Sequence, residues 1–152
     1  MYIVSSSDSG ETFSKATKLG TGEWKLNACP MDGGMIAMDS NAQWAAVWSR
    51  KGSVYRSTNE SEQEQLLGIG GQPWVTSTQA GTVVVWSNPM ERTLHVQMPN
   101  DSLPLKLADS AIDPVVVSNP NGDGSVVVFW ETKLEGQSAI LSIPLIRGAV
   151  KP

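Results

Sequence analysis

Short apolar runs that end in tryptophan recur three times along the chain. They span residues 43–48, 82–86 and 125–130. Each is rich in small or β-branched apolar residues, and runs of this length and composition predict buried strands. A second short apolar segment precedes each run, at 35–38, 74–76 and 115–117. The chain is therefore predicted to repeat a unit built of strands.

The repeat length indicates the architecture. Trp48, Trp86 and Trp130 are separated by 38 and 44 residues, close to the roughly 40 to 50 residues of a four-stranded propeller blade. Solenoid repeats of roughly 20 to 34 residues fit less well. We expect an all-β fold, a β-propeller of four-stranded antiparallel blades. The three tryptophans, which occupy the same place in each repeat, are expected to pack between blades rather than to stack on a sugar.

The repeats divide the chain into four parts. They are the outer strands of a blade (1–30), two complete blades (31–70 and 71–110) and a nearly complete blade (111–152). This single partial propeller holds about three and a half blades, whereas a closed ring needs roughly four to eight. It is part of a longer protein, pairs with a second copy, or closes as an atypical small ring. Because an isolated half-ring would expose apolar faces and strand edges, we favour the first two.

A turn motif near the N-terminus is the most specific signal. Ser6, Asp8, Gly10, Thr12 and Phe13 fit the pattern Ser-x-Asp-x-Gly-x-Thr-aromatic at every fixed position. Asp8 is expected to accept hydrogen bonds from amides across the turn, and Gly10 to adopt a positive φ. Phe13 is expected to tuck under the hairpin. The motif predicts a structural staple between two strands, not a metal ligand or a catalyst.

On these residues the chain resembles the BNR or Asp-box β-propeller proteins of the sialidase-like superfamily. The resemblance extends to residues 24–34, 47–55 and 71–75, which are similar to a bacterial group of sialidase-like proteins. It implies an extracellular or periplasmic protein, although the first five residues contain no signal-peptide pattern. It also implies a ligand site over the central channel, on the rim opposite the Asp8 turn.

Alternation of antiparallel strands assigns every turn to one of two rims. Asp8, Asn59 and Asp101 belong to one rim. The opposite rim, which includes a turn predicted at 131–136, carries the candidate ligand-binding residues Asp32, Arg50, Arg92, Asp113 and Glu131.

These candidates leave alternatives open. An arginine pair would suit a carboxylate ligand, which arginine binds bidentately. Arg50 and Arg92 come from corresponding turns, and each is either a ligand contact or a solvated turn charge. Asp32 either caps the Gly33-Gly34 link or contacts ligand.

Composition excludes several classes of partner. With 11 basic and 15 acidic residues the chain has a net charge of −4, which argues against nucleic acid. No apolar run approaches the roughly 18 to 20 residues that span a bilayer, so no membrane insertion is expected. The lone Cys29 excludes an internal disulfide. The lone His95 argues against a zinc site or a catalytic triad, and no metal or cofactor is expected.

Three functions fit these observations. The first is a binding module that recognises a carbohydrate or a protein without turnover. The second is a sialidase-type exo-glycosidase whose site is completed by a missing half or a second copy. The third is a structural propeller without a ligand. No catalytic residue is assigned, and release of sialic acid would distinguish the second function from the others.

Overall fold

The computed structural model describes residues 1–23, 34–119 and 124–145. All regular structure in these ranges is β-strand. In chain order the strands are β1 (Tyr2–Ile3), β2 (Thr17–Lys18), β3 (Met35–Met38), β4 (Trp44–Arg50), β5 (Ser53–Thr58), β6 (Ser61–Ile69), β7 (Gly71–Thr78), β8 (Gly81–Asn88), β9 (Thr93–Gln97), β10 (Leu105–Asp109), β11 (Ile112–Ser118), β12 (Val126–Leu134) and β13 (Gln137–Leu145). The described residues contain no helix with the length and apolar character needed to cross a membrane.

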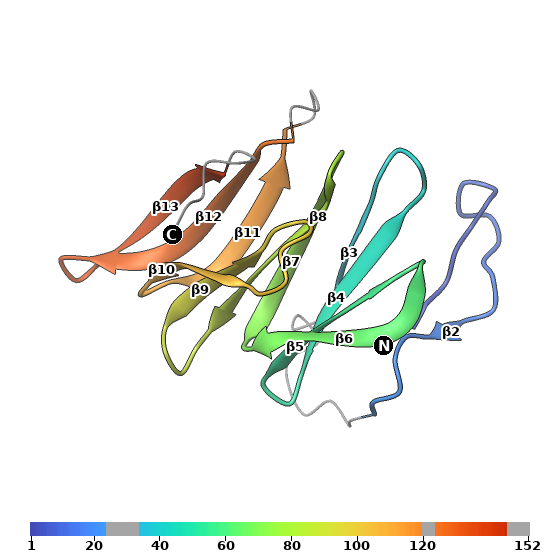
Figure 1. Ribbon diagram of the computed structural model, residues 1–152, viewed down its shortest axis with the longest axis horizontal. Coiled ribbons are helices and arrows are strands. Elements are labelled where there is room, and N and C mark those ends of the chain that lie inside the picture. The colour runs from blue at the N-terminus through green and yellow to red at the C-terminus, as the bar shows by residue number, and fades with distance from the viewer. Residues whose placement is uncertain (24–33, 120–123, 146–152) are drawn as a thin grey trace.

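The strands form four antiparallel sheets in which sequence neighbours pair. The sheet orders are β1-β2, β3-β4-β5-β6, β10-β9-β8-β7 and β11-β12-β13. The sheets follow one another across Figure 1, from the N-terminal hairpin to β13. The predicted all-β class is thus confirmed, and two antiparallel four-stranded sheets are consistent with a propeller-type fold. The number of blades stays a prediction.

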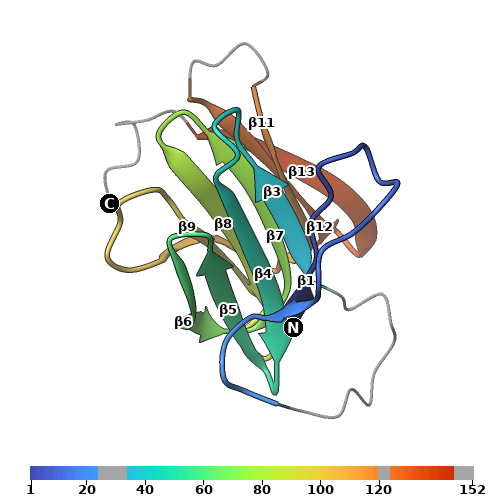
Figure 2. The same cartoon turned by 90° about the vertical axis from the view of Figure 1, so that its right-hand side faces the viewer.

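Each junction between successive sheets is an apolar cluster that contains one of the repeated tryptophans. Trp48 packs with Leu19 behind the β3–β6 sheet, and Trp86 packs with Val47 between the two four-stranded sheets. Trp130 packs with Leu94 at the last junction. The predicted packing of these tryptophans is therefore confirmed. Figure 2 shows the N-terminal hairpin in front of β4, the strand that carries Trp48.

The hairpin turn after β12 corrects one prediction. Glu135 and Gly136 both have positive φ, 52° and 83°, which is the signature of a two-residue type I′ turn. Because this turn is so short, β12 continues four residues beyond Trp130. Glu131 therefore lies inside the strand, opposite Ile112 and Ile140, and its predicted place in a turn is wrong.

The Asp8 turn is held by a compact set of hydrogen bonds. Ser6 Oγ donates to Asp8 Oδ1 over 2.6 Å, and the Thr12 amide donates to the same oxygen over 2.9 Å. The donors Ser6 and Thr12 hold the pKa of the Asp8 carboxyl well below its ordinary value. Gly10 has φ 93°, and its amide donates to Ser6 Oγ over 2.8 Å. The side chain of Asp8 thus organises the turn from within.

Phe13 lies differently from the prediction. Its side chain is 64% exposed, so it does not tuck under the hairpin. The ladder between β1 and β2 joins only residues 2–3 with 17–18. The loop that carries Phe13 extends beyond this short ladder, as Figure 1 shows.

Replacing Asp8 with Ala is expected to loosen this turn without affecting the rest of the fold. The amide of Thr12 and the hydroxyls of Ser6 and Thr12 lose their acceptor. Deuterium uptake measured by mass spectrometry should become several-fold faster in peptides spanning 5–14 and stay unchanged in β7–β10. Glu11→Ala is the matched control in the same loop. Equal uptake in the two variants would contradict the role given to Asp8.

Candidate functional site

The turns separate onto two rims, and contacts on the first rim follow the sequence prediction. Asn59, in the turn after β5, donates from Nδ2 to Gln43 Oε1 over 2.6 Å. Its Oδ1 accepts from the Trp44 amide over 3.2 Å. The turn after β5 and the turn before β4 therefore meet at one end of the sheet, as predicted.

The opposite rim contains a cavity of about 510 Å³. Its walls come from the turns after β4 and β8 and from the links that lead into β7 and β11. The lining residues are Ser49, Gly52, Ile69, Gly70, Gly71, Gln72, Ser87, Asn88, Pro89, Met90, Ile112 and Asp113. The cavity thus lies where the ends of three sheets converge, on the rim predicted to hold the ligand site.

Two lining residues share an unusual backbone. Gln72 and Asp113 have φ values of 51° and 49°, although each lies within a strand and directly precedes a proline. A residue before proline normally avoids helical conformations, and positive φ is uncommon without glycine. In both strands the pairing register shifts at this point, which marks a bulge. Bulges re-aim side chains, and strained positions cluster at functional sites.

These two bulges bring three polar side chains into one chain of hydrogen bonds. Ser87 Oγ donates to Gln72 Oε1 over 2.8 Å, and Gln72 Nε2 donates to Asp113 Oδ1. Ser87 is 1% exposed. Because both ends of the Gln72 amide are bonded, its orientation is fixed. The chain of bonds joins β8, β7 and β11, and so crosses the junction between two sheets.

The remaining walls are largely apolar. Ile69, Met90 and Ile112 expose 65%, 89% and 36% of their surface. Met90 belongs to the turn between β8 and β9, which Asn88 stabilises. The Oδ1 atom of Asn88 accepts from the amides of Met90 and Glu91 over 3.1 and 3.4 Å. The cavity therefore combines a fixed polar row with an apolar wall.

The predicted site residues separate in the structure. Asp113 lines the cavity. Arg92 is exposed in the turn after β8 and is not among the lining residues; its carbonyl accepts from the Ala111 amide over 3.1 Å. Glu131 is half-buried in β12, where it accepts from Ser138 Oγ over 3.3 Å, and it does not line the cavity. Asp32 lies outside the described residues.

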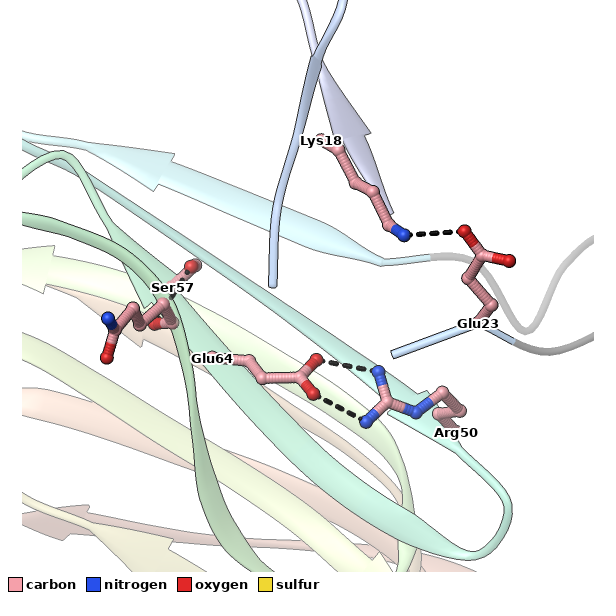
Figure 3. Close-up of polar contacts among 6 residues, drawn as sticks. Lys18, Glu23, Arg50, Ser57 and Glu64 are labelled. Carbon is pink, nitrogen blue, oxygen red and sulfur yellow. Dashed lines mark hydrogen bonds and ion pairs between the residues drawn. The ribbon is translucent and has the colours of Figure 1, made fainter. Parts of the chain in front are cut away.

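Arg50 takes part in a largely buried ion pair. Its guanidinium meets Glu64 bidentately, with N–O distances of 2.6 and 2.7 Å (Figure 3). The two side chains are only 11% and 14% exposed, and the guanidinium lies 4.1 Å from the centre of the Tyr55 ring. The interpretation of Arg50 as a solvated turn charge is therefore wrong. The bidentate guanidinium fork is occupied by Glu64, and Arg50 is not among the residues that line the cavity.

The pair also contacts the N-terminal segment. A Cβ on Gly20 or Gly22 would overlap the side chain of Glu64 or Arg50. Hydrogen bonds from Arg50 lower the pKa of Glu64, and Glu64 raises that of Arg50. Figure 3 shows a second, more exposed pair nearby, between Lys18 and Glu23 at 2.7 Å. Arg50 and Glu64 thus connect the N-terminal segment with the β3–β6 sheet.

Sequence reasoning missed Gln72 and Ser87. A signal for Gln72 was present, since Gln72-Pro73 and Asp113-Pro114 stand at the same place in successive repeats. Gln72 carries no charge, so the charge pattern that marked Asp113 did not mark it. In the described part of the chain no group of three His, Cys, Asp or Glu side chains is arranged to hold a metal ion.

Among known proteins, a solved structure resembles this fold, whereas no sequence match is found. No family model matches the chain, and no curated protein matches its sequence; membership of the Asp-box family stays a prediction. A solved structure of similar fold is a mutant α-L-arabinofuranosidase from Fusarium graminearum in complex with an iminosugar inhibitor. It has 12% identity and a TM-score of 0.52 over 91% of this chain and 48% of that one. The chain thus spans about half the length of that enzyme and has a β-propeller-like all-β fold.

Proposed function

We propose that this protein is a carbohydrate-binding module and that the cavity between β7, β8 and β11 holds the sugar. The observation that supports this most is the fixed chain of hydrogen bonds through Ser87, Gln72 and Asp113. Sugar hydroxyls both donate and accept, and a carboxylate beside an amide offers both kinds of partner. The apolar wall at Ile69 and Met90 suits the C–H face of a sugar ring.

The size and charge of the cavity limit the class of ligand that it can bind. A volume of about 510 Å³ accommodates a mono- or disaccharide and falls within the roughly 300 to 1,000 Å³ of small-molecule sites. Asp113 is the only charged residue among the described lining residues. A sialic acid would place its carboxylate near that of Asp113, and the two negative charges would repel each other. Arg50 would not offset this repulsion, because its guanidinium is paired with Glu64. We therefore propose a neutral sugar.

An exo-glycosidase is the alternative function. The structural neighbour is an α-L-arabinofuranosidase, which favours carbohydrate chemistry in general. Hydrolysis normally uses two carboxyl groups roughly 5 to 10 Å apart. Among the described lining residues Asp113 is the only carboxylate, so a second one would have to come from elsewhere. Binding without turnover is the function that the described residues support better.

A glycan array that includes neutral and sialylated glycans tests the proposal. Binding to neutral glycans is expected, with no release of sugar from fluorogenic arabinofuranosides or sialosides. Hydrolysis of either substrate would favour the alternative. Absence of binding to every glycan would contradict both carbohydrate functions.

Asp113→Asn and Gln72→Ala are expected to weaken binding of the selected glycan about 10- to 100-fold, the range for hydrogen bonds that involve a charged group. Asp113→Asn keeps an oxygen that accepts from Gln72, so the fold should be unaffected. The matched control is Asp101→Asn, an exposed carboxylate on the opposite rim. Isothermal titration calorimetry measures the affinities. Unchanged affinity in both cavity variants would place the sugar elsewhere.

A further inference from the structure

The two ends of the stack of sheets expose apolar positions that the interior buries. Trp48, Trp86 and Trp130 occupy equivalent positions in β4, β8 and β12, so the three sheets can be compared residue by residue.

The outer face of β11–β13 is one such surface. Phe129, the residue before Trp130, corresponds to Val47 and Val85. The two valines are 0% exposed because the next sheet covers them, whereas Phe129 is 37% exposed. Val117 and Ile140, on the same face of the sheet, are 44% and 78% exposed. We call these residues, with Val127, the forward face. Glu131, opposite Ile140, and Ser142, opposite Phe129, lie on the same side of the sheet. No sheet among the described residues covers these exposed apolar positions.

The complementary surface is the face of β3 that carries Ile36. Ile36 pairs with Ala46 and corresponds to Val75 and Val116 in the next two sheets. Those two are 4% and 1% exposed, whereas Ile36 is 54% exposed. Met38, on the same face of β3, is 65% exposed. We call Ile36 and Met38, with the neighbouring Tyr2 and Val4, the back face.

The back face is hollowed as well as apolar. A cavity of about 240 Å³ lies between β1 and β3, and Tyr2, Val4 and Ile36 contribute to its lining. At the interior junctions this side of a sheet is covered by the preceding sheet: Val75, for example, packs with Ala45 and Val47. The short N-terminal hairpin covers Trp48 but leaves Ile36 open.

We infer that the occupant of both faces is a second copy of this chain. The forward face of each copy would cover the back face of the other, so that two equivalent contacts related by a two-fold axis close one ring. The length of the structural neighbour agrees with this arrangement, because 91% of this chain matches 48% of that one. Two copies therefore supply about as much chain as that single protein. The inference is independent of whether the cavity binds a sugar.

Light scattering coupled to size-exclusion chromatography tests the inference on the intact chain. The wild type should show twice the chain mass of 16.3 kDa. Phe129→Lys and Ile36→Glu should each raise the dimer dissociation constant at least about tenfold, because each buries a charge against an apolar surface. Leu103→Lys is the control, since Leu103 is 73% exposed in a loop outside both faces.

Mixing the two variants gives a sharper test. A mixed dimer has one junction between two wild-type surfaces and one junction that combines both substitutions, where the introduced positive and negative charges meet as an ion pair. Each separate variant has two damaged junctions. The mixture of Phe129→Lys and Ile36→Glu should therefore recover the dimer mass. If either variant lacks the circular dichroism of the wild type, Phe129→Ser and Ile36→Ser replace the pair, and loss of the dimer mass in both is expected.

Three outcomes overturn the inference. The first is a wild-type mass of one chain. The second is a series of higher masses, which would indicate an open head-to-tail assembly. The third is a dimer that Phe129→Lys, Ile36→Glu and Leu103→Lys leave equally intact, because the contact would then lie on another surface.

Discussion

Replacing Trp86 with Ala is expected to lower the free energy of unfolding by about 3–5 kcal/mol, the usual cost of removing a buried large aromatic side chain. Trp86 is 1% exposed between the two four-stranded sheets. Its ring stacks on His95 with centroids 5.6 Å apart, and its Nε1 donates to the Ile69 carbonyl over 3.2 Å. Urea unfolding followed by far-ultraviolet circular dichroism measures the change.

A graded series separates the contributions of Trp86. Trp86→Phe keeps an aromatic ring over His95 but loses the donor to Ile69, so a smaller loss of about 1–2 kcal/mol is expected. Leu103→Ala, at an exposed position, should stay within about 0.5 kcal/mol of the wild type. A loss below about 1 kcal/mol for Trp86→Ala would show that the junction between the sheets does not depend on this side chain.

The sequence contained enough information to predict these junctions because the relevant signal is periodic. In β8, Val83 and Val85 lie on one buried face while Val84 and Trp86 lie on the other, and both faces are apolar. A strand buried on both faces reads as a continuous apolar run, and three such runs at similar spacing indicate stacked sheets. The all-β class follows from local composition and repeat length alone.

The candidate site was predicted less well, for two physical reasons. Its position on a rim follows from strand alternation, which put Asp113 on the rim where the cavity lies. The bulges at Gln72 and Asp113, however, have positive φ angles directly before a proline, which local backbone preferences disfavour. The second reason is that the length of a turn was not predicted. Glu131 was expected in a long turn, but it lies in a nine-residue strand that ends in a two-residue turn.

The ion-pair partner of Arg50 could also not be predicted from the sequence. Arg50 ends β4, and Glu64 lies on β6, with β5 between them in the sheet. The register of β5 against β6 shifts twice, next to Val54 and next to Arg56. Such shifts decide which side chain of β6 comes opposite a given residue, and no local sequence pattern predicts them. Only the folded sheet identifies Glu64 as the carboxylate that reaches Arg50.

Replacing Glu64 with Gln is expected to lower the free energy of unfolding by about 2–3 kcal/mol at pH 7. This is below the roughly 3–5 kcal/mol for breaking a fully buried pair, because the two side chains retain 11% and 14% exposure. The substitution leaves the Arg50 guanidinium without a counter-charge in a poorly hydrated place. The double variant Arg50→Met with Glu64→Leu should recover most of the loss, since replacing both partners by apolar groups is often nearly neutral.

The pH dependence provides an independent readout of the same pair. The folded protein lowers the pKa of Glu64 from its ordinary value of 4.5, chiefly through hydrogen bonds from Arg50. A lowered carboxyl pKa contributes stability that is complete above the unfolded value and is lost as the pH falls through the folded value. The stability difference between wild type and Glu64→Gln should therefore be constant near neutral pH and shrink below about pH 4.5. A difference that persists unchanged at about pH 3 would show that Glu64 acts through packing and not through its charge.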